Sequence, residues 1–217
     1  MAFDIFLNFE KISLSIIENE IAQMTNENCD TDNDEFAEVD ESKFVPNLYH
    51  GSIVATFIVN LYETTLNTIL GRRLGCTETD IFKTSHEVKL QLICTMFNVD
   101  ISKIKGDSTY GYLRSIVKLR NDIKHFKSSA IGMGHNIWTD TKIPMGTSKD
   151  ALAVMFTKNY MEQHYNGVLR LLELICRKCG LVLFKDCLLI DGDGRNSACE
   201  FVLTQQAYDE RNQYEAE

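Results

Sequence analysis

Three residues near the middle of this 217-residue chain carry side chains that can do chemistry together: Arg120, Asn121 and His125. His125 has an imidazole that titrates near neutral pH, Arg120 is a permanent cation, and Asn121 both donates and accepts hydrogen bonds. A proton-transfer group and a cation that stabilises a charged phosphorane can cleave RNA through attack of a 2′-hydroxyl on phosphorus. That reaction needs no metal ion or other cofactor. The sequence therefore predicts His125 as general acid or base, Arg120 as phosphate clamp and Asn121 as the group that orients the imidazole.

Cationic side chains extend this candidate site along the chain. At 100° per residue of a helix, Arg114 and Lys118 fall on the same side as Asn121 and His125. They can therefore bind flanking phosphates of an RNA, and Lys124 is a third candidate RNA-binding residue. The alternative is a solvated basic helix face that includes a surface histidine. Spacing alone leaves both interpretations open.

The spacing of Arg120 and His125 also resembles a known signature. The pattern is R-x4-H with a polar residue directly after the arginine, and it resembles the motif of the HEPN superfamily. Members of that superfamily are small helical bundles, and many are metal-independent RNA-cleaving toxins or defence effectors. The resemblance covers at most Leu48 to Phe126. It implies an endoribonuclease that acts as a toxin or an antiviral effector.

The geometry of the motif predicts a homodimer. Positions i and i+5 lie about 140° apart on an ideal helix, so Arg120 and His125 point in different directions. A second chain packed antiparallel would bring two motifs into one cleft. The resemblance implies the same arrangement, because HEPN proteins generally dimerise with paired motifs at the interface. The expected partners are an RNA substrate, a second copy and an inhibitory or antitoxin protein. The alternative function is a non-catalytic module that binds RNA, a nucleotide or a partner protein.

Glu63 is the candidate supporting residue. It lies in the segment Leu61-Tyr62-Glu63-x-x-Leu66-Asn67, which looks like a segment of several HEPN groups. In those groups an acidic residue lies in a hydrophobic helix packed near the motif helix. The resemblance implies a carboxylate that pairs with Arg120 and orients it. The alternatives are an exposed glutamate and a structural ion pair with Arg72 or Arg120.

Helices must position these side chains, and apolar periodicity predicts where the helices lie. The motif helix is expected over Asp107–Lys127, since its apolar residues alternate between spacings of four and three. Those residues are Tyr112, Ile116, Leu119, Ile123 and Phe126. The other expected helices are Phe3–Gln23, Leu48–Arg73, Asp80–Phe97 and Thr147–Cys179, with Asp100–Asp107 as a connection. The more regular part of the third of these segments is expected to open at Ser85-His86-Glu87. In the first of them, Phe6, Phe9, Ile12 and Ile16 mark the expected apolar period, and Ile5, Ile17 and Ile21 widen that stripe.

Loops and a hairpin are expected for the remaining segments. Thr25–Ser42 is acidic and almost free of large apolar residues, so residues 25–45 are interpreted as a mobile acidic loop. Pro46 and Pro144 are placed where helices are interrupted. Short apolar runs predict a C-terminal hairpin, followed by a polar end. These runs are Leu181–Phe184, Leu188–Ile190 and Phe201–Leu203, and the polar end is Gln205–Glu217.

The sequence therefore predicts an all-α fold, a bundle of four or five helices with up-and-down connections and a small C-terminal β-hairpin. Residues 1–180 would form the HEPN-like bundle, and residues 181–217 the hairpin and polar tail. The net charge of −9 argues against a protein that coats nucleic acid generally, which would be basic. It leaves room for an enzyme with one locally basic cleft.

Cellular location follows from the absence of targeting signals. The N-terminus has no basic segment followed by an apolar run, and no apolar run approaches the ~18 residues of a membrane span. The expectation is a cytoplasmic protein without membrane association.

The seven cysteines raise a metal alternative. Cys176 and Cys179 have zinc-knuckle spacing, and Cys187 and Cys199 are candidates to complete four thiolates. The second pair is twelve residues apart and lacks the expected C-x2-C form. Buried free thiols are the favoured interpretation, and no metal is assigned to the site.

Overall fold

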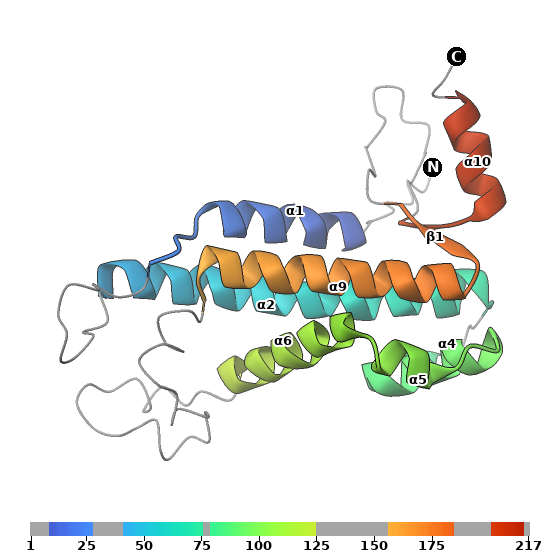
Figure 1. Ribbon diagram of the computed structural model, residues 1–217, viewed down its shortest axis with the longest axis horizontal. Helices are drawn as coiled ribbons and strands as arrows, with labels where there is room; N and C mark the ends of the chain where they lie inside the picture. The colour runs from blue at the N-terminus through green and yellow to red at the C-terminus, as the bar shows by residue number, and fades with distance from the viewer. Residues whose placement is uncertain (1–8, 28–40, 76–78, 125–155, 185–200, 215–217) are drawn as a thin grey trace, which may run out of the picture. The chain divides into compact units, whose positions relative to one another are not determined.

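The computed structural model describes residues 9–27, 41–75, 79–124, 156–184 and 201–214, which are mostly helical (Figure 1). Besides the helices, the described residues form a small antiparallel sheet near the C-terminus, so the predicted fold class is confirmed. The elements are α1 (Phe9–Ala22), α2 (Glu41–Thr68), the π-helix η1 (Ile69–Arg73), α3 (Thr79–Phe82), α4 (His86–Met96), α5 (Ile101–Lys105), α6 (Ser108–Lys124), α9 (Lys158–Lys178), β1 (Leu181–Leu183), β2 (Val202–Thr204) and α10 (Gln205–Tyr214).

The chain divides into two compact units. The first unit comprises Met1–Ser15, Asn60–Tyr110 and Gly167–Glu217. The second comprises Ile16–Val59 and Gly111–Asn166. The long helices α1, α2, α6 and α9 each contribute residues to both units. The predicted boundary after residue 180 stays a prediction.

The second unit is held together by polar contacts that lie between helices. His50 on α2 and Glu20 on α1 approach to 2.6 Å between Nδ1 and Oε2. Tyr165 on α9 donates its hydroxyl to the Glu18 carboxylate at 3.2 Å. Apolar packing accompanies these contacts. A Cβ placed on Gly51 would lie 2.6 Å from the Phe156 ring, so only glycine fits the present packing.

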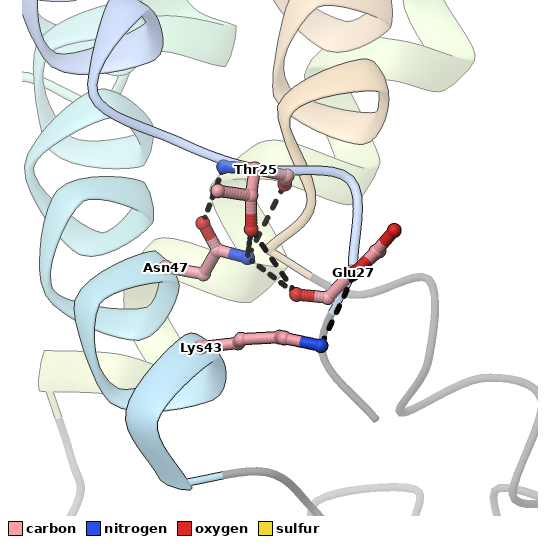
Figure 2. Close-up of polar contacts among 4 residues, drawn as sticks. All are labelled: Thr25, Glu27, Lys43 and Asn47. Carbon is pink, nitrogen blue, oxygen red and sulfur yellow. Dashed lines mark hydrogen bonds and ion pairs between the residues drawn. The ribbon is translucent and has the colours of Figure 1, made fainter. Parts of the chain in front are cut away.

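The segment that follows α1 is fixed to α2 through Asn47 (Figure 2). The Asn47 carbonyl oxygen accepts from Thr25 N–H at 2.9 Å. Its amide nitrogen lies 3.2 Å from both oxygens of Thr25 and 3.4 Å from the Glu27 carbonyl. Lys43 adds an ion pair with Glu27 at 3.2 Å. Because both the carbonyl and the amino group of this buried amide have hydrogen-bond partners, Asn47 fixes the path of the chain after α1.

The start of α2 corrects two predictions. Residues 41–45, assigned to the acidic loop, are helical, and Pro46 lies inside α2 and interrupts nothing. Proline is excluded from a helix because it lacks an N–H and crowds the carbonyl four residues earlier. Here only one backbone hydrogen bond is lost, in the second turn, so the helix begins before the proline. Residues 28–40 of the predicted loop and Pro144 lie outside the described residues.

The first unit contains the small sheet. β1 pairs with β2 in antiparallel register, with Leu181 opposite Thr204 and Leu183 opposite Val202. The Arg73 guanidinium donates to the Val202 carbonyl and ties the sheet to the end of η1. The predicted C-terminal hairpin is therefore confirmed in its two strands. The intervening run Leu188–Ile190 lies outside the described residues.

Several predicted boundaries and faces differ from the structure. In α1 the apolar residues Phe9 and Ile12 are 57% and 39% exposed, whereas Leu14, Ile17 and Ile21 are buried. Ile17 and Ile21, which were expected to widen the apolar stripe, therefore lie on the buried side, Ile16 is half-buried, and Phe9 and Ile12 lie on the solvent side. Both sides of this helix are apolar, so periodicity could not choose between them.

Short helices replace two segments that were predicted otherwise. The connection Asp100–Asp107 contains α5, begun by Asp100, whose carboxylate accepts from Ser102 N–H at 2.9 Å. The polar end contains α10, in which Gln205 and Gln206 donate to Asp209 and Glu210 one turn later, both at 2.8 Å. Such local contacts stabilise helices that have no strong apolar period.

The third and last predicted helices also begin differently. The expected helix Asp80–Phe97 is divided into α3 and α4, and Ser85 caps α4 through Val88 N–H at 3.4 Å. α9 begins at Lys158 rather than Thr147, because Phe156 adopts a positive φ of 58° and Thr157 accepts from Tyr160 N–H at 3.3 Å. Residues 147–155 lie outside the described residues.

One stretch, Ser42–Gly71, is long and apolar enough to cross a membrane by length and composition. The sequence prediction had recognised no run of this kind. In the structure 61% of its apolar window is buried, as in the core helix of a bundle. The core helices of soluble proteins pass the same test, so the expected absence of membrane association stays a prediction.

Candidate functional site

The motif helix α6 presents a polar strip to solvent. Arg114, Lys118 and Asn121 are exposed, whereas Leu113 and Ile116 are buried. The strip has spacings of four and three residues, so its side chains lie above one another on one face. Neither cation has an ion-pair partner among the described residues. The predicted polar face of the motif helix is therefore accessible and positively charged.

Arg120 lies apart from this strip. Its side chain is half-buried, and its position on the helix falls between those of Leu113 and Ile116. At 100° per residue, Arg120 lies about 100° from Asn121, and its partial burial agrees with that position. Arg120 and the exposed cations of α6, Arg114 and Lys118, therefore lie in different surroundings.

Two predicted site residues fall at the end of the described segment. Lys124 is the last residue of α6, and His125 lies outside the described residues. The spatial relation of His125 to Arg120 and Asn121 therefore stays a prediction, as do its predicted acid–base role and the roles of Asn121 and Arg120.

Glu63 has a partner that the sequence analysis did not consider. Its carboxylate lies 3.9 Å from Nδ1 of His86, the first residue of α4. The His86 ring also meets the edge of Tyr62, with ring centroids 5.9 Å apart. The structure therefore gives Glu63 a place between α2 and α4, and its predicted pairing with Arg120 stays a prediction.

An aromatic cluster around His164 of α9 was also missed by the sequence analysis. The His164 ring is buried against Tyr160 and the edge of Tyr112, with centroids 4.1 and 5.5 Å away. Nδ1 lies 2.8 Å from the Tyr160 carbonyl, so this nitrogen donates a proton and Nε2 is left as the acceptor. Burial lowers the pKa of His164, which keeps the ring neutral near pH 7.

Two tyrosines of the motif helix differ in burial. Tyr110 is buried, whereas Tyr112 is half-exposed and its hydroxyl accepts from Gln163 at 3.2 Å. Tyr160 and His164 are four residues apart, which is the spacing of neighbours on a helix face. That spacing is the sequence signal that could have identified the pair.

The described cysteines behave as structural thiols. Cys94, Cys176 and Cys179 are buried and free, and burial raises the pKa of Cys176 and Cys179 to about 12. No group of three or more histidine, cysteine or acidic side chains suited to a metal occurs in the described part of the chain. Cys187 and Cys199 lie outside it.

Comparisons of the chain with protein-family models, with curated proteins and with solved structures find no match.

Proposed function

We propose that the chain is a metal-independent endoribonuclease of HEPN type that acts as a homodimer. The observation that carries the proposal is the exposed strip of Arg114, Lys118 and Asn121 on α6, which leads into the motif Arg120–His125. The guanidinium of Arg114 and the ammonium of Lys118, which have no ion-pair partners among the described residues, attract the phosphates of an RNA strand.

In this proposal each residue of the motif has one task. His125 moves the proton of the attacking 2′-hydroxyl or of the leaving oxygen, and Arg120 stabilises the charged phosphorane. Asn121 orients the imidazole. The strip holds the flanking phosphates, and Lys124 extends it. The enzyme would be a toxin or an antiviral effector in the cytoplasm, restrained by an inhibitory protein that covers the cationic strip.

Cleavage of RNA by purified protein in excess EDTA tests the catalytic part. The wild type is compared with Arg120→Ala, His125→Ala and the control Lys103→Ala, which removes an exposed cation from α5. The proposal expects products with 2′,3′-cyclic phosphate ends, lost in both motif variants and kept in the control. Cleavage that persists in His125→Ala, or that stops in EDTA, would overturn it.

A non-catalytic RNA-binding module is the second candidate. It is favoured by the composition of the exposed face of α6, where the described strip offers two cations and an amide and no group that titrates near neutral pH. Such a face binds phosphates without cleaving them. RNA binding that is lost in Arg114→Ala/Lys118→Ala, with no cleavage of that RNA by wild type, would select this candidate.

A further inference from the structure

A pocket of about 530 Å³ lies in the first unit, and its lining includes none of the residues of the proposed ribonuclease site. The start of α6, the C-terminal half of α9, β1 and the first residue of α10 form its wall. Pockets between about 300 and 1,000 Å³ are the size that holds small organic ligands. A ligand in this pocket does not depend on the proposed ribonuclease function.

Two arginines on α9 supply the positive charge of the pocket. Arg170 and Arg177 are seven residues apart, which is two helical turns or about 10.5 Å, so both lie on one face. Both are exposed, and neither makes an ion pair within 4 Å with another described residue. The planar guanidinium fork matches the oxygens of phosphate, so the two side chains favour a phosphorylated ligand.

Two carboxylates, those of Asp107 and Glu173, also line the pocket. Asp107 precedes α6 and accepts from Thr109 N–H at 2.9 Å and from Thr109 Oγ1 at 2.6 Å. These hydrogen bonds, with a smaller contribution from Arg177, lower the pKa of Asp107. Its carboxylate is thereby engaged in capping the helix. Glu173 lies on α9 between the arginines and can accept from hydroxyl or amino groups of a ligand.

The rest of the wall is partly apolar and carries one amide side chain. Leu174 from α9 and Leu181 and Leu183 from β1 provide aliphatic surface, and Gln205 provides an amide at the start of α10. A phosphate group, hydroxyl donors and a planar heterocycle occur together in nucleotides. We propose that the pocket binds a nucleoside phosphate, with Arg170 and Arg177 on its phosphates and Leu174 and Leu181 against its base.

The experiment is calorimetric titration of the full chain with ATP, GTP, CTP and UTP at low salt. The expected result is at least one nucleotide with a Kd below about 100 µM, which corresponds to about −5.5 kcal/mol. Arg170→Gln/Arg177→Gln should weaken this binding at least tenfold. The matched control Lys103→Ala/Lys178→Ala removes two exposed cations that do not line the pocket and should bind as wild type does.

Two further titrations separate the contribution of the phosphate to binding from that of the nucleoside. Inorganic phosphate and the free nucleoside should each bind more weakly than the nucleotide, because each occupies only part of the pocket. Arg114→Ala/Lys118→Ala should leave nucleotide binding unchanged, so failure of the ribonuclease proposal leaves this one standing. The proposal is overturned if no nucleotide binds with a Kd below about 100 µM, or if the pocket variant and the control lose affinity equally.

Discussion

The side-chain amide of Asn47 contacts both the N–H and the carbonyl of Thr25, at 2.9 and 3.2 Å (Figure 2). Asn47 is 1% exposed, so water cannot replace these contacts in the present packing. A buried amide with backbone partners in the segment after α1 positions that segment against α2 more firmly than apolar contact would, because hydrogen bonds are directional.

Replacement of Asn47 is therefore expected to destabilise the fold. Asn47→Ala should lower the free energy of unfolding by about 1–3 kcal/mol, since it removes several hydrogen bonds and leaves their backbone partners unsatisfied. Asn60→Ala, an exposed position on the same helix, should change it by less than about 0.5 kcal/mol. Unfolding in denaturant, followed by circular dichroism, measures both. Equal effects for the two variants would contradict the assigned role.

Two glycines offer a matched test of packing. A Cβ at Gly51 would lie 2.6 Å from Phe156 and 3.1 Å from Met161, whereas a Cβ at Gly111 meets nothing within 4 Å. Gly51→Ala should destabilise the protein by about 1–3 kcal/mol through overpacking. Gly111→Ala should stabilise it by about 0.5–1 kcal/mol, because alanine is the better helix former.

Thermal or denaturant unfolding of the two glycine variants shows directly whether each substitution raises or lowers the free energy of unfolding. Opposite signs are expected although the substitution is the same and both sites are helical. A stabilised Gly51→Ala would mean that Phe156 moves away at no cost and that the packing between α2 and the start of α9 is loose.

Local signals in the sequence located most elements of this fold. The alternating spacing around Ile116 and Leu119 predicted α6. Which face is buried depends on contacts with distant residues. Phe9 and Ile12 show this, since they are as apolar as the buried Ile17 and nothing nearby in the sequence distinguishes them.

The candidate site, like the fold, was predictable from the sequence only where it depends on local helical geometry. The side of α6 that carries Arg114 and Lys118 follows from helical geometry, and the structure shows it exposed. The contact between Glu63 and His86 could not be foreseen, because it depends on how α4 lies against α2. The same holds for His164, whose environment comes from two helices far apart in the sequence.

His164 makes stability depend on pH. Burial lowers the pKa of His164 in the folded state, so the unfolded state binds a proton more readily. Stability is fully present above the ordinary histidine pKa of about 6.5 and falls as the pH drops below it. The loss for one proton cannot exceed about 1.4 kcal/mol per pH unit.

Comparison with His164→Phe isolates this contribution. The variant keeps an aromatic ring beside Tyr112 and Tyr160 and removes the titrating group. Unfolding between about pH 5.5 and 7.5 should show a shallower pH dependence in the variant than in wild type. Identical slopes would mean that His164 is protonated equally in both states, and that other groups cause the acid sensitivity.

Tyr62 and Tyr165 provide a final paired prediction about buried hydroxyls. Tyr62 is fully buried, and its hydroxyl has no hydrogen-bond partner among the described residues. The Tyr165 hydroxyl donates to Glu18 at 3.2 Å. Tyr62→Phe should leave the free energy of unfolding unchanged or raise it, because an unsatisfied polar group is removed. Tyr165→Phe should lower it by about 0.5–1.5 kcal/mol. Denaturant unfolding of both variants measures the difference, and a loss above about 1 kcal/mol in Tyr62→Phe would show that its hydroxyl is bonded to an internal water.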